Sequence, residues 1–253
     1  MVADTKTTSS ESRFYLFSRD GTLRRTYKPD GAYFLDVTIS PDGRSIAYIS
    51  PRAWWDDNRV LTTVVYLGII DTQTGNEIGE MLLGPADPDG SNSAAGVAGR
   101  TAWSQDSTLY ALIPGGLYRV DRITASPVKL HGMNEPSPGG LAVSPDGKQI
   151  WYESAEGSHE GRSLWSVDIA SGARKQRVSR SRSGRVVGAS FSPDGKWLMF
   201  IQERLFYVGS VLIYPEVCSV RLSEDLIDTQ DMEVYVLDVG GKRFESKGAV
   251  AWF

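Results

Sequence analysis

Short apolar runs alternate with polar turns along this chain, and one phrase with that pattern returns four times. An apolar run leads into Ser-Pro-Asp-Gly or a variant of it, and a second apolar run follows, in Asp36–Tyr48, Arg100–Tyr110, Leu141–Tyr152 and Ala189–Phe200. Proline fixes φ for one turn position, and Asp-Gly tolerates the left-handed geometry that comes next. Each copy therefore predicts a hairpin of two short strands.

A second signature comes after each of these phrases. Alternating apolar residues end at an aspartate, a small turn follows, and a polar strand comes last, in Val65–Gly75, Leu117–Asp121, Leu164–Gly172 and Val234–Gly241. Each unit then supplies four strands, A to D. Repetition of such units along a chain is typical of a β-propeller.

The two ends of the chain complete each other in this scheme. Phe14–Tyr27 has the pattern of a C–D pair without an A strand, and Ala249–Phe253 resembles an A strand with nothing after it. We expect both in one blade, because joining the first and last blades removes free sheet edges. Val2–Thr5 is the candidate for the B strand of that blade.

The sequence therefore predicts one all-β domain over residues 1–253, a five-bladed β-propeller of four-stranded blades. The ring is closed by the N- and C-terminal strands in one blade. The expected blades are 249–253 with 2–27, then 34–80, 99–130, 139–178 and 186–246. The alternative is a fragment of a propeller with six or more blades, cut inside a blade.

Composition narrows the function classes. The chain has 253 residues, is 41% hydrophobic and carries a net charge of −4, so it can bury one sizeable core but has no general attraction to nucleic acid or anionic membranes. No apolar run is long enough for a membrane span, and Met1–Lys6 lacks the features of a signal peptide. The single cysteine, Cys218, excludes an internal disulfide, and we expect it to be a buried apolar residue.

The phrase x-Ser-Pro-Asp-Gly-Lys-x-Ile-x-(Tyr/Phe), followed by Leu-Trp-x-Val-Asp-x-x-x-Gly, resembles the propeller repeat of the TolB family and of prolyl-oligopeptidase-type peptidases. The four copies span most of residues 34–246. The resemblance implies a propeller and favours a binding role, with the bacterial envelope as compartment if a signal was removed. It departs from TolB in lacking the helical domain and one blade, and from the peptidases in lacking the α/β-hydrolase domain.

The first candidate site is Pro51–Arg59, expected as the loop between strands B and C of the second blade. Long connections on a rigid frame favour function, and Trp and Arg dominate interface hot spots. Adjacent tryptophans and carboxylates suit a sugar, a cation or a peptide. We expect a partner to contact Trp54, Trp55, Asp56, Asp57 and Arg59. The alternative is structural: one tryptophan covers the edge of the blade, and the other packs within the loop.

The second candidate is the arginine-rich segment Arg174–Arg185, which starts in a D strand and runs into the next connection. Clustered arginines bind carboxylate or phosphate groups, and the chain is otherwise acidic. The segment lacks the interleaved aromatics of single-strand binders, which favours an acidic protein surface over nucleic acid. We expect contacts from Arg177, Arg180, Arg182 and Arg185. The alternative is a solvated loop.

Three weaker patterns carry little chemistry. Asp87–Asn92 has spaced oxygens but lacks the rest of a calcium loop, so we expect a turn there. His131 and His159 are expected to be exposed loop residues, and no nucleophile elbow is present. The insertion Glu203–Asp231 is rich in apolar residues, and it either extends the fifth blade or docks a partner; we favour extension, with an exposed acidic tip near Ser223–Asp231.

We therefore expect a non-enzymatic binding or assembly module. It holds a protein or peptide on its long-loop face, the face of the propeller that carries the B–C and D–A connections, and one alternative is that it is a subunit of a larger complex. No catalytic residue, metal or cofactor is assigned. The rival is a carbohydrate-binding or glycoside-hydrolysing propeller that uses Trp54 and Trp55, with Asp36 and Asp56 as a carboxylate pair in the central mouth.

Overall fold

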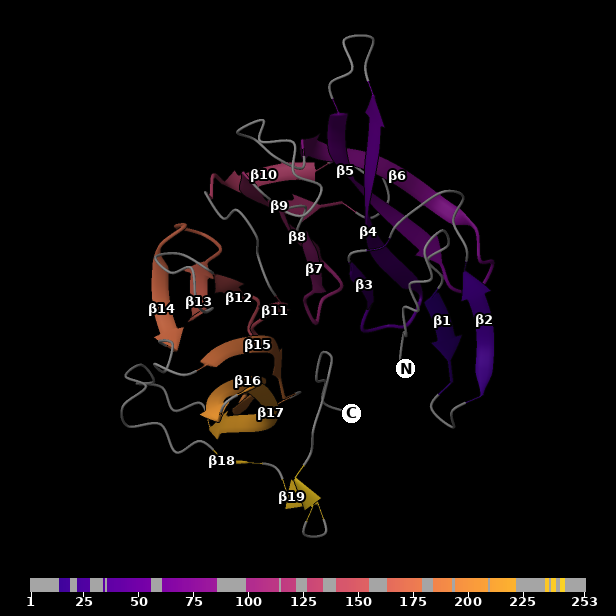
Figure 1. Ribbon diagram of the computed structural model, residues 1–253. Coiled ribbons are helices and arrows are strands. Elements are labelled where there is room, and N and C mark those ends of the chain that lie inside the picture. The colour runs from indigo at the N-terminus through magenta and orange to yellow at the C-terminus, as the bar shows by residue number, and fades with distance from the viewer. Residues whose placement is uncertain are drawn as a thin grey trace. The chain divides into compact units, whose positions relative to one another are not determined.

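The computed structural model describes residues 14–18, 22–27, 34, 36–55, 61–85, 99–113, 115–121, 127–133, 140–154, 163–178, 184–192, 194–208, 210–221, 235–236, 238–239 and 242–243. Every regular element in these ranges is a β-strand (Figure 1). The chain divides into two compact units, Met1–Ser137 and Pro138–Phe253, which are described separately.

The first unit holds one hairpin and two four-stranded antiparallel sheets. The hairpin pairs β1 (Phe14–Phe17) with β2 (Leu23–Tyr27). The next sheet has the order β3-β4-β5-β6, with β3 (Asp36–Ile39), β4 (Ser45–Trp55), β5 (Leu61–Asp71) and β6 (Glu77–Pro85). The last has the order β7-β8-β9-β10, with β7 (Arg100–Trp103), β8 (Leu109–Ile113), β9 (Gly116–Val120) and β10 (Pro127–His131).

The second unit holds two further sheets of the same kind and one small hairpin. One sheet has the order β11-β12-β13-β14, with β11 (Leu141–Val143), β12 (Gln149–Ser154), β13 (Ser163–Asp168) and β14 (Arg174–Val178). The other has the order β15-β16-β17-β18, with β15 (Gly184–Phe191), β16 (Trp197–Val208), β17 (Ser210–Arg221) and β18 (Tyr235–Val236). The hairpin pairs β19 (Asp238–Val239) with β20 (Lys242–Arg243).

Consecutive strands are neighbours in all four sheets, as in the blades of a propeller. The prediction of an all-β chain built from four-stranded antiparallel units is therefore confirmed. The expected closing strand Ala249–Phe253 and the segment Val2–Thr5 lie outside the described residues, so ring closure and a fifth blade stay predictions.

The repeated serine and aspartate fix the turn between the first two strands of each sheet. Ser40 Oγ donates to Asp42 Oδ1 over 2.5 Å and accepts the Ser45 N–H over 2.9 Å, while Asp42 Oδ1 also accepts the Arg44 N–H over 3.0 Å. Gly43 takes φ +69°, as the motif requires. The same serine-to-aspartate bond recurs at Ser104, Ser144 and Ser192, so the motif organises the turns.

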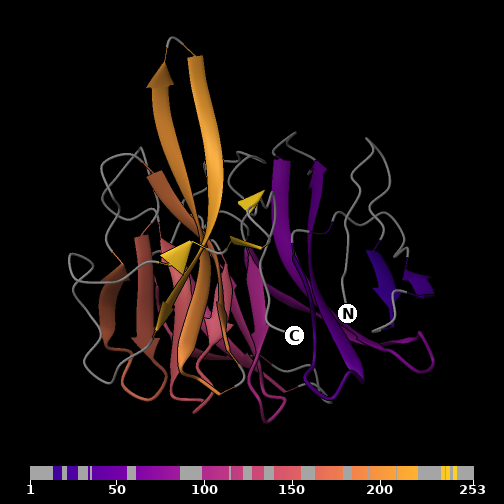
Figure 2. The same cartoon turned by 90° about the horizontal axis from the view of Figure 1, so that it is seen from below.

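In two sheets the second turn lies beside the first. The Thr72 N–H donates to the Arg44 carbonyl over 2.9 Å, and the Ile169 N–H donates to the Lys148 carbonyl over the same distance. The connection between the second and third strands is consequently at the opposite end of each of these sheets. Figure 2 shows β4 and β5, and likewise β16 and β17, extending at that end beyond the other strands of their own sheets.

Apolar side chains cover both faces of the β3–β6 sheet. One face packs against the β7–β10 sheet through residues such as Ile49, Leu67 and Ile113. The other face packs against the β1–β2 hairpin, where Phe14, Phe34 and Tyr48 form a buried aromatic group. The β3–β6 sheet is therefore packed on both of its faces.

The expected C–D hairpin of the last four-stranded sheet is wrong. Val234–Gly241 does not form this hairpin, because β17 is the third strand of the sheet. Tyr235 and Val236 form the fourth strand and pair with Ser219 and Cys218. The reason is that β16 and β17 pair over their whole length, from Trp197↔Arg221 to Val208↔Ser210. The expected tip Ser223–Asp231 lies outside the described residues.

Candidate functional site

The second wrong assignment concerns the tryptophans. Pro51–Trp55 belongs to strand β4 rather than to a loop, and Trp54 and Trp55 pair with Thr62 and Leu61 of β5. Strand β3 ends its pairing at Asp36↔Ile49, and β6 ends at Val64↔Pro85. A two-stranded ribbon therefore carries both tryptophan positions beyond the sheet. The cross-strand partners in β5 supply the backbone bonds that hold Pro51–Trp55 in a strand.

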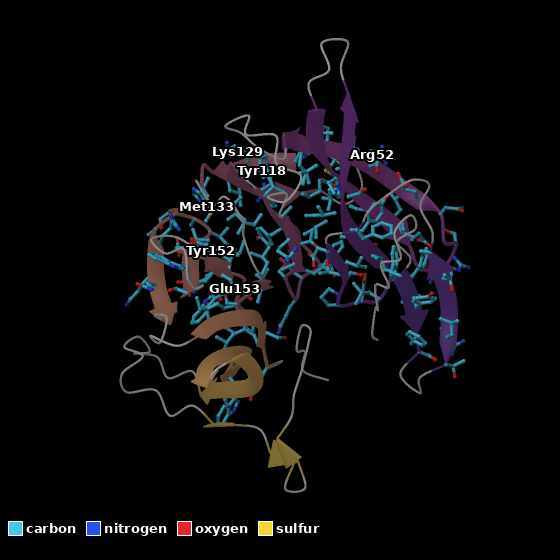
Figure 3. The ribbon with its side chains drawn as sticks, in the orientation of Figure 1. Arg52, Tyr118, Lys129, Met133, Tyr152 and Glu153 are labelled. Atoms are coloured by element: carbon cyan, nitrogen blue, oxygen red, sulfur yellow. The ribbon has the colours of Figure 1, made fainter. Side chains whose placement is uncertain are left out.

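Below the tryptophan positions lies a cluster formed by Arg52, Tyr66 and Glu80. The Arg52 guanidinium lies 4.4 Å from the centroid of the Tyr66 ring and forms an ion pair with Glu80 Oε1. The Arg52 side chain is 41% exposed and that of Glu80 is 17% exposed. Three adjacent strands thus contribute one side chain each, and Figure 3 labels Arg52 beside β4.

A buried tyrosine lies on the same face of the β3–β6 sheet as Arg52, closer to the turn that precedes β4. Tyr48 is 1% exposed, and its hydroxyl donates to Glu77 Oε2 over 3.0 Å. Burial and the neighbouring Glu77 carboxylate raise the pKa of Tyr48 well above its usual range, so the hydroxyl stays a donor. Gly68 lies under the ring, since a Cβ there would be 2.0 Å from Tyr48 Cζ. The base of the ribbon is therefore rigid.

Sequence reasoning missed the cluster. The available signal was the strand period of two: Arg52 precedes Trp54 by two positions, and residues two apart on a strand share a face. Next to the cluster, Leu82 of β6 is 54% exposed and pairs with Tyr66. A cation, an aromatic ring, a carboxylate and an exposed apolar side chain together can contact a polypeptide through hydrogen bonds and apolar packing.

The structure does not describe every residue of the first candidate site. Asp56, Asp57 and Arg59 lie outside the described residues, and for Trp54 and Trp55 only the strand position is described.

In the arginine-rich segment, the structure places Arg177 against its own sheet. Its guanidinium lies 5.2 Å from the Trp151 ring, and Nε donates to Ser166 Oγ over 2.7 Å while Nη2 donates to Gln149 Oε1 over 3.2 Å. Partial burial lowers the pKa of Arg177, yet the side chain stays a cation because arginine titrates far above neutral pH. Arg177 thus stabilises the packing around Trp151.

The remaining arginines of this segment are described only in part. Arg180 and Arg182 lie outside the described residues. Arg185 lies in β15, where it pairs with Glu203 of β16, and its side chain is not described. The segment therefore ends at the point where β16 leaves its sheet.

Asp36, the carboxylate of the rival hypothesis, joins two sheets of the first unit. Its Oδ2 accepts the Thr101 N–H over 2.6 Å and the Thr101 hydroxyl over 2.9 Å, and Thr38 and Thr101 share a hydroxyl contact of 2.8 Å. Burial raises the pKa of Asp36, while the Arg100 charge and the Thr101 bonds oppose that shift. These contacts give Asp36 a structural role between β3 and β7. Asp56 lies outside the described residues.

The other candidates carry no assembled chemistry in the part of the chain that the structure describes. No three His, Cys, Asp or Glu side chains there come together as a metal site. His131 ends strand β10 and is half-buried, so the prediction of an exposed loop residue is wrong there. His159 and Asp87–Asn92 lie outside the described ranges. Cys218 lies in β17 opposite Phe200. Among the described residues no helix is long and apolar enough to span a membrane.

Comparisons with known proteins support the fold. No family model matches the chain, and no curated protein sequence matches it. Several solved structures are similar to the chain in fold. The chain is similar to a glucose dehydrogenase, with 17% identity and a TM-score of 0.52 over 93% of this chain and 84% of that one. It is also similar to a chain of a nidogen/laminin complex, with 8% identity and a TM-score of 0.50 over 89% and 93%.

A third similar structure is the hydrazine synthase of Kuenenia stuttgartiensis, with 19% identity and a TM-score of 0.45; the match covers 81% of this chain but only 65% of that one. At these identities the likeness concerns the fold alone. The likeness to the chain of the nidogen/laminin complex supports a β-propeller-like fold, which agrees with the four-stranded sheets.

Proposed function

We propose that this protein is a non-enzymatic binding or assembly module built on a five-bladed, TolB-like propeller. It holds a protein or peptide partner at the ends of its sheets where the longest hairpins lie. One observation carries the proposal: strand β4 takes Trp54 and Trp55 past the other strands of its sheet, above a base that Arg52, Tyr66 and Glu80 hold in place.

A rigid base favours affinity. Side chains that are already ordered lose little entropy when a partner binds, and Tyr, Trp and Arg contribute most of the energy in protein interfaces. The backbone of the ribbon is held by its register from Ser45↔Asp71 to Trp55↔Leu61. The tryptophan positions can therefore act as an apolar anchor without a folding step.

The arginine-rich segment steers an acidic partner in this proposal. Arg180, Arg182 and Arg185 supply the charge, because the guanidinium of Arg177 already contacts Trp151 and Ser166. Long-range attraction between opposite charges raises the association rate, whereas buried aromatic anchors lower the dissociation rate.

The test is binding kinetics with the natural partner at two salt concentrations. Trp55→Ala should speed dissociation at least about tenfold, since a buried aromatic anchor contributes roughly 2 kcal/mol or more. Arg180→Glu with Arg182→Glu should slow association and flatten its salt dependence. Leu23→Ala, at an exposed apolar position of β2, is the matched control. Wild-type kinetics in both variants would remove these sheet ends from consideration as the interface.

A further inference from the structure

The longest hairpin of the second unit is a ribbon whose two faces are both apolar. β16 pairs with β15 only as far as Gly184↔Arg204, and β17 pairs with β18 only at Cys218 and Ser219. Beyond Arg204, residues 205–208 and 210–213 pair with each other and with no other described strand. Figure 2 shows this pair rising beyond the rest of its sheet.

The register decides which positions share a face. Residues directly opposite in an antiparallel pair lie on one face, and successive residues alternate between faces. One face of the ribbon therefore holds Leu205, Tyr207, Val211 and Ile213, and the other holds Phe206, Val208, Ser210 and Leu212. No residue from 205 to 214 carries a charge. A half-buried ribbon would alternate apolar and polar positions instead.

The ribbon of the first unit provides a contrast. The β4–β5 hairpin extends from its sheet in a similar way, but Trp55 is followed by Asp56, Asp57 and Arg59. The sequence thus places charged residues directly after strand β4. No charged residue lies at the tip of the β16–β17 ribbon, so its sequence favours an apolar surrounding.

We propose that the tip of the β16–β17 ribbon inserts into the interfacial layer of a lipid bilayer that contains anionic lipid. A protein docked on one face would leave the other apolar face in water, whereas lipid surrounds both faces at once. Aromatic residues such as Phe206, Tyr207 and Tyr214 suit the interfacial depth. This inference does not depend on the proposed protein partner.

Charge and length agree with a shallow insertion. Four residues beyond Arg204 span roughly 13 Å at the rise of a strand, which is long enough to reach the ~5–10 Å depth of interfacial insertion while Arg204 stays near the headgroups. Arg185 lies next to this level, because it follows Gly184, the register partner of Arg204. Its own register partner is Glu203, whose negative charge offsets one of the two positive charges, so Arg204 is the residue that the charge test changes. Deeper insertion is disfavoured, since the outer strand edges would lose their hydrogen bonds to water.

The experiment is co-flotation of the full chain with two kinds of vesicle, phosphatidylcholine alone and phosphatidylcholine with one quarter phosphatidylglycerol. Phe206→Ser with Leu212→Ser removes two register partners from the tip and should weaken binding to the mixed vesicles about a hundredfold. The matched control is Leu23→Ser with Val128→Ser, which removes two exposed apolar side chains elsewhere and should leave binding unchanged.

A charge variant tests the second half of the inference. Arg204→Gln should weaken binding to the mixed vesicles about fivefold and leave binding to phosphatidylcholine vesicles unchanged. Thermal unfolding of each variant, monitored by circular dichroism, separates lost binding from lost folding.

Four results would overturn the proposal. The first is no flotation of the wild-type chain with either vesicle, and the second is equal flotation of the tip variant while it remains folded. The third is binding to soluble polyglutamate in place of vesicles, which would indicate an acidic protein surface as the partner. The fourth is self-association that the tip variant abolishes, without vesicle binding, which would indicate a second copy of the chain as the occupant.

Discussion

Gly68→Ala should destabilise the first unit by about 1.5–5 kcal/mol, because the space above Gly68 is filled by a buried ring. An ideal Cβ at this position would lie 2.0 Å from Tyr48 Cζ and 2.2 Å from its hydroxyl oxygen. Tyr48 therefore has to move by more than an ångström, in a site where it is 1% exposed and packs edge-on against Phe34 at 5.3 Å.

The magnitude follows from what that movement disrupts. Overpacking a core costs about 1–3 kcal/mol, and losing the hydrogen bond from Tyr48 to Glu77 adds about 1 kcal/mol. Weakened aromatic packing adds about 0.5–1.5 kcal/mol. Replacing a strand glycine by alanine returns roughly 0.5–1 kcal/mol, which leaves a net cost of about 1.5–5 kcal/mol.

The assay is equilibrium unfolding in urea, compared with Gly132→Ala. An added Cβ at Gly132 meets nothing within 4 Å, and this control should stay within about 0.5 kcal/mol of the wild type. In a Tyr48→Leu background the cost of Gly68→Ala should fall, since the colliding ring is gone. Equal unfolding midpoints for Gly68→Ala and Gly132→Ala would refute the packing account of this sheet.

Three further predictions concern the turns, the buried carboxylate and the chain ends. Ser107 takes φ +64° where the equivalent turns have glycine, so Ser107→Gly should raise the free energy of unfolding in urea by roughly 0.5–1 kcal/mol. Gly147 takes φ +70°, so Gly147→Ala should lower the free energy of unfolding by a similar amount, and effects of equal sign would contradict the shared turn geometry. Burial raises the pKa of Asp36, so its folded form binds a proton more tightly than the unfolded chain, and stability from this group is present at low pH and lost as pH rises above about 4. The stability of Asp36→Asn relative to wild type should therefore increase between pH 3.5 and 7, and a pH-independent difference would contradict the assigned shift. Deleting residues 249–253 should lower the melting temperature by several degrees and promote association through an opened sheet edge, whereas an unchanged melting curve would exclude ring closure by this segment.

The turns show how far local sequence reaches. Ser40 and Asp42 form hydrogen bonds with each other and with the backbone of Arg44 and Ser45, so the turn depends on a run of six residues. The same holds for the alternating apolar runs on either side, which is why the four-stranded units could be predicted.

The sites depended on contacts that are distant in sequence. Pro51–Trp55 is predicted as part of the loop between two strands, yet pairing with β5 makes it part of strand β4. Arg177 is predicted to contact a partner; its guanidinium also contacts Trp151 and Ser166 across its own sheet, and the partner contact stays a prediction. Such cross-strand partners follow from register, which depends on the whole sheet and not on a short run of residues.

If Trp54 and Trp55 hold a protein partner, replacing both should reduce the capture of that partner from the native source. Three baits are needed: the wild-type chain, Trp54→Ala with Trp55→Ala, and Leu23→Ala with Val128→Ala as the control for exposed apolar positions. Retained proteins are quantified by mass spectrometry, with the folding of each bait checked by urea unfolding. The account predicts at least one protein retained by the wild type and the control and reduced about tenfold or more on the tryptophan variant. Equal retention by all three folded baits would contradict it.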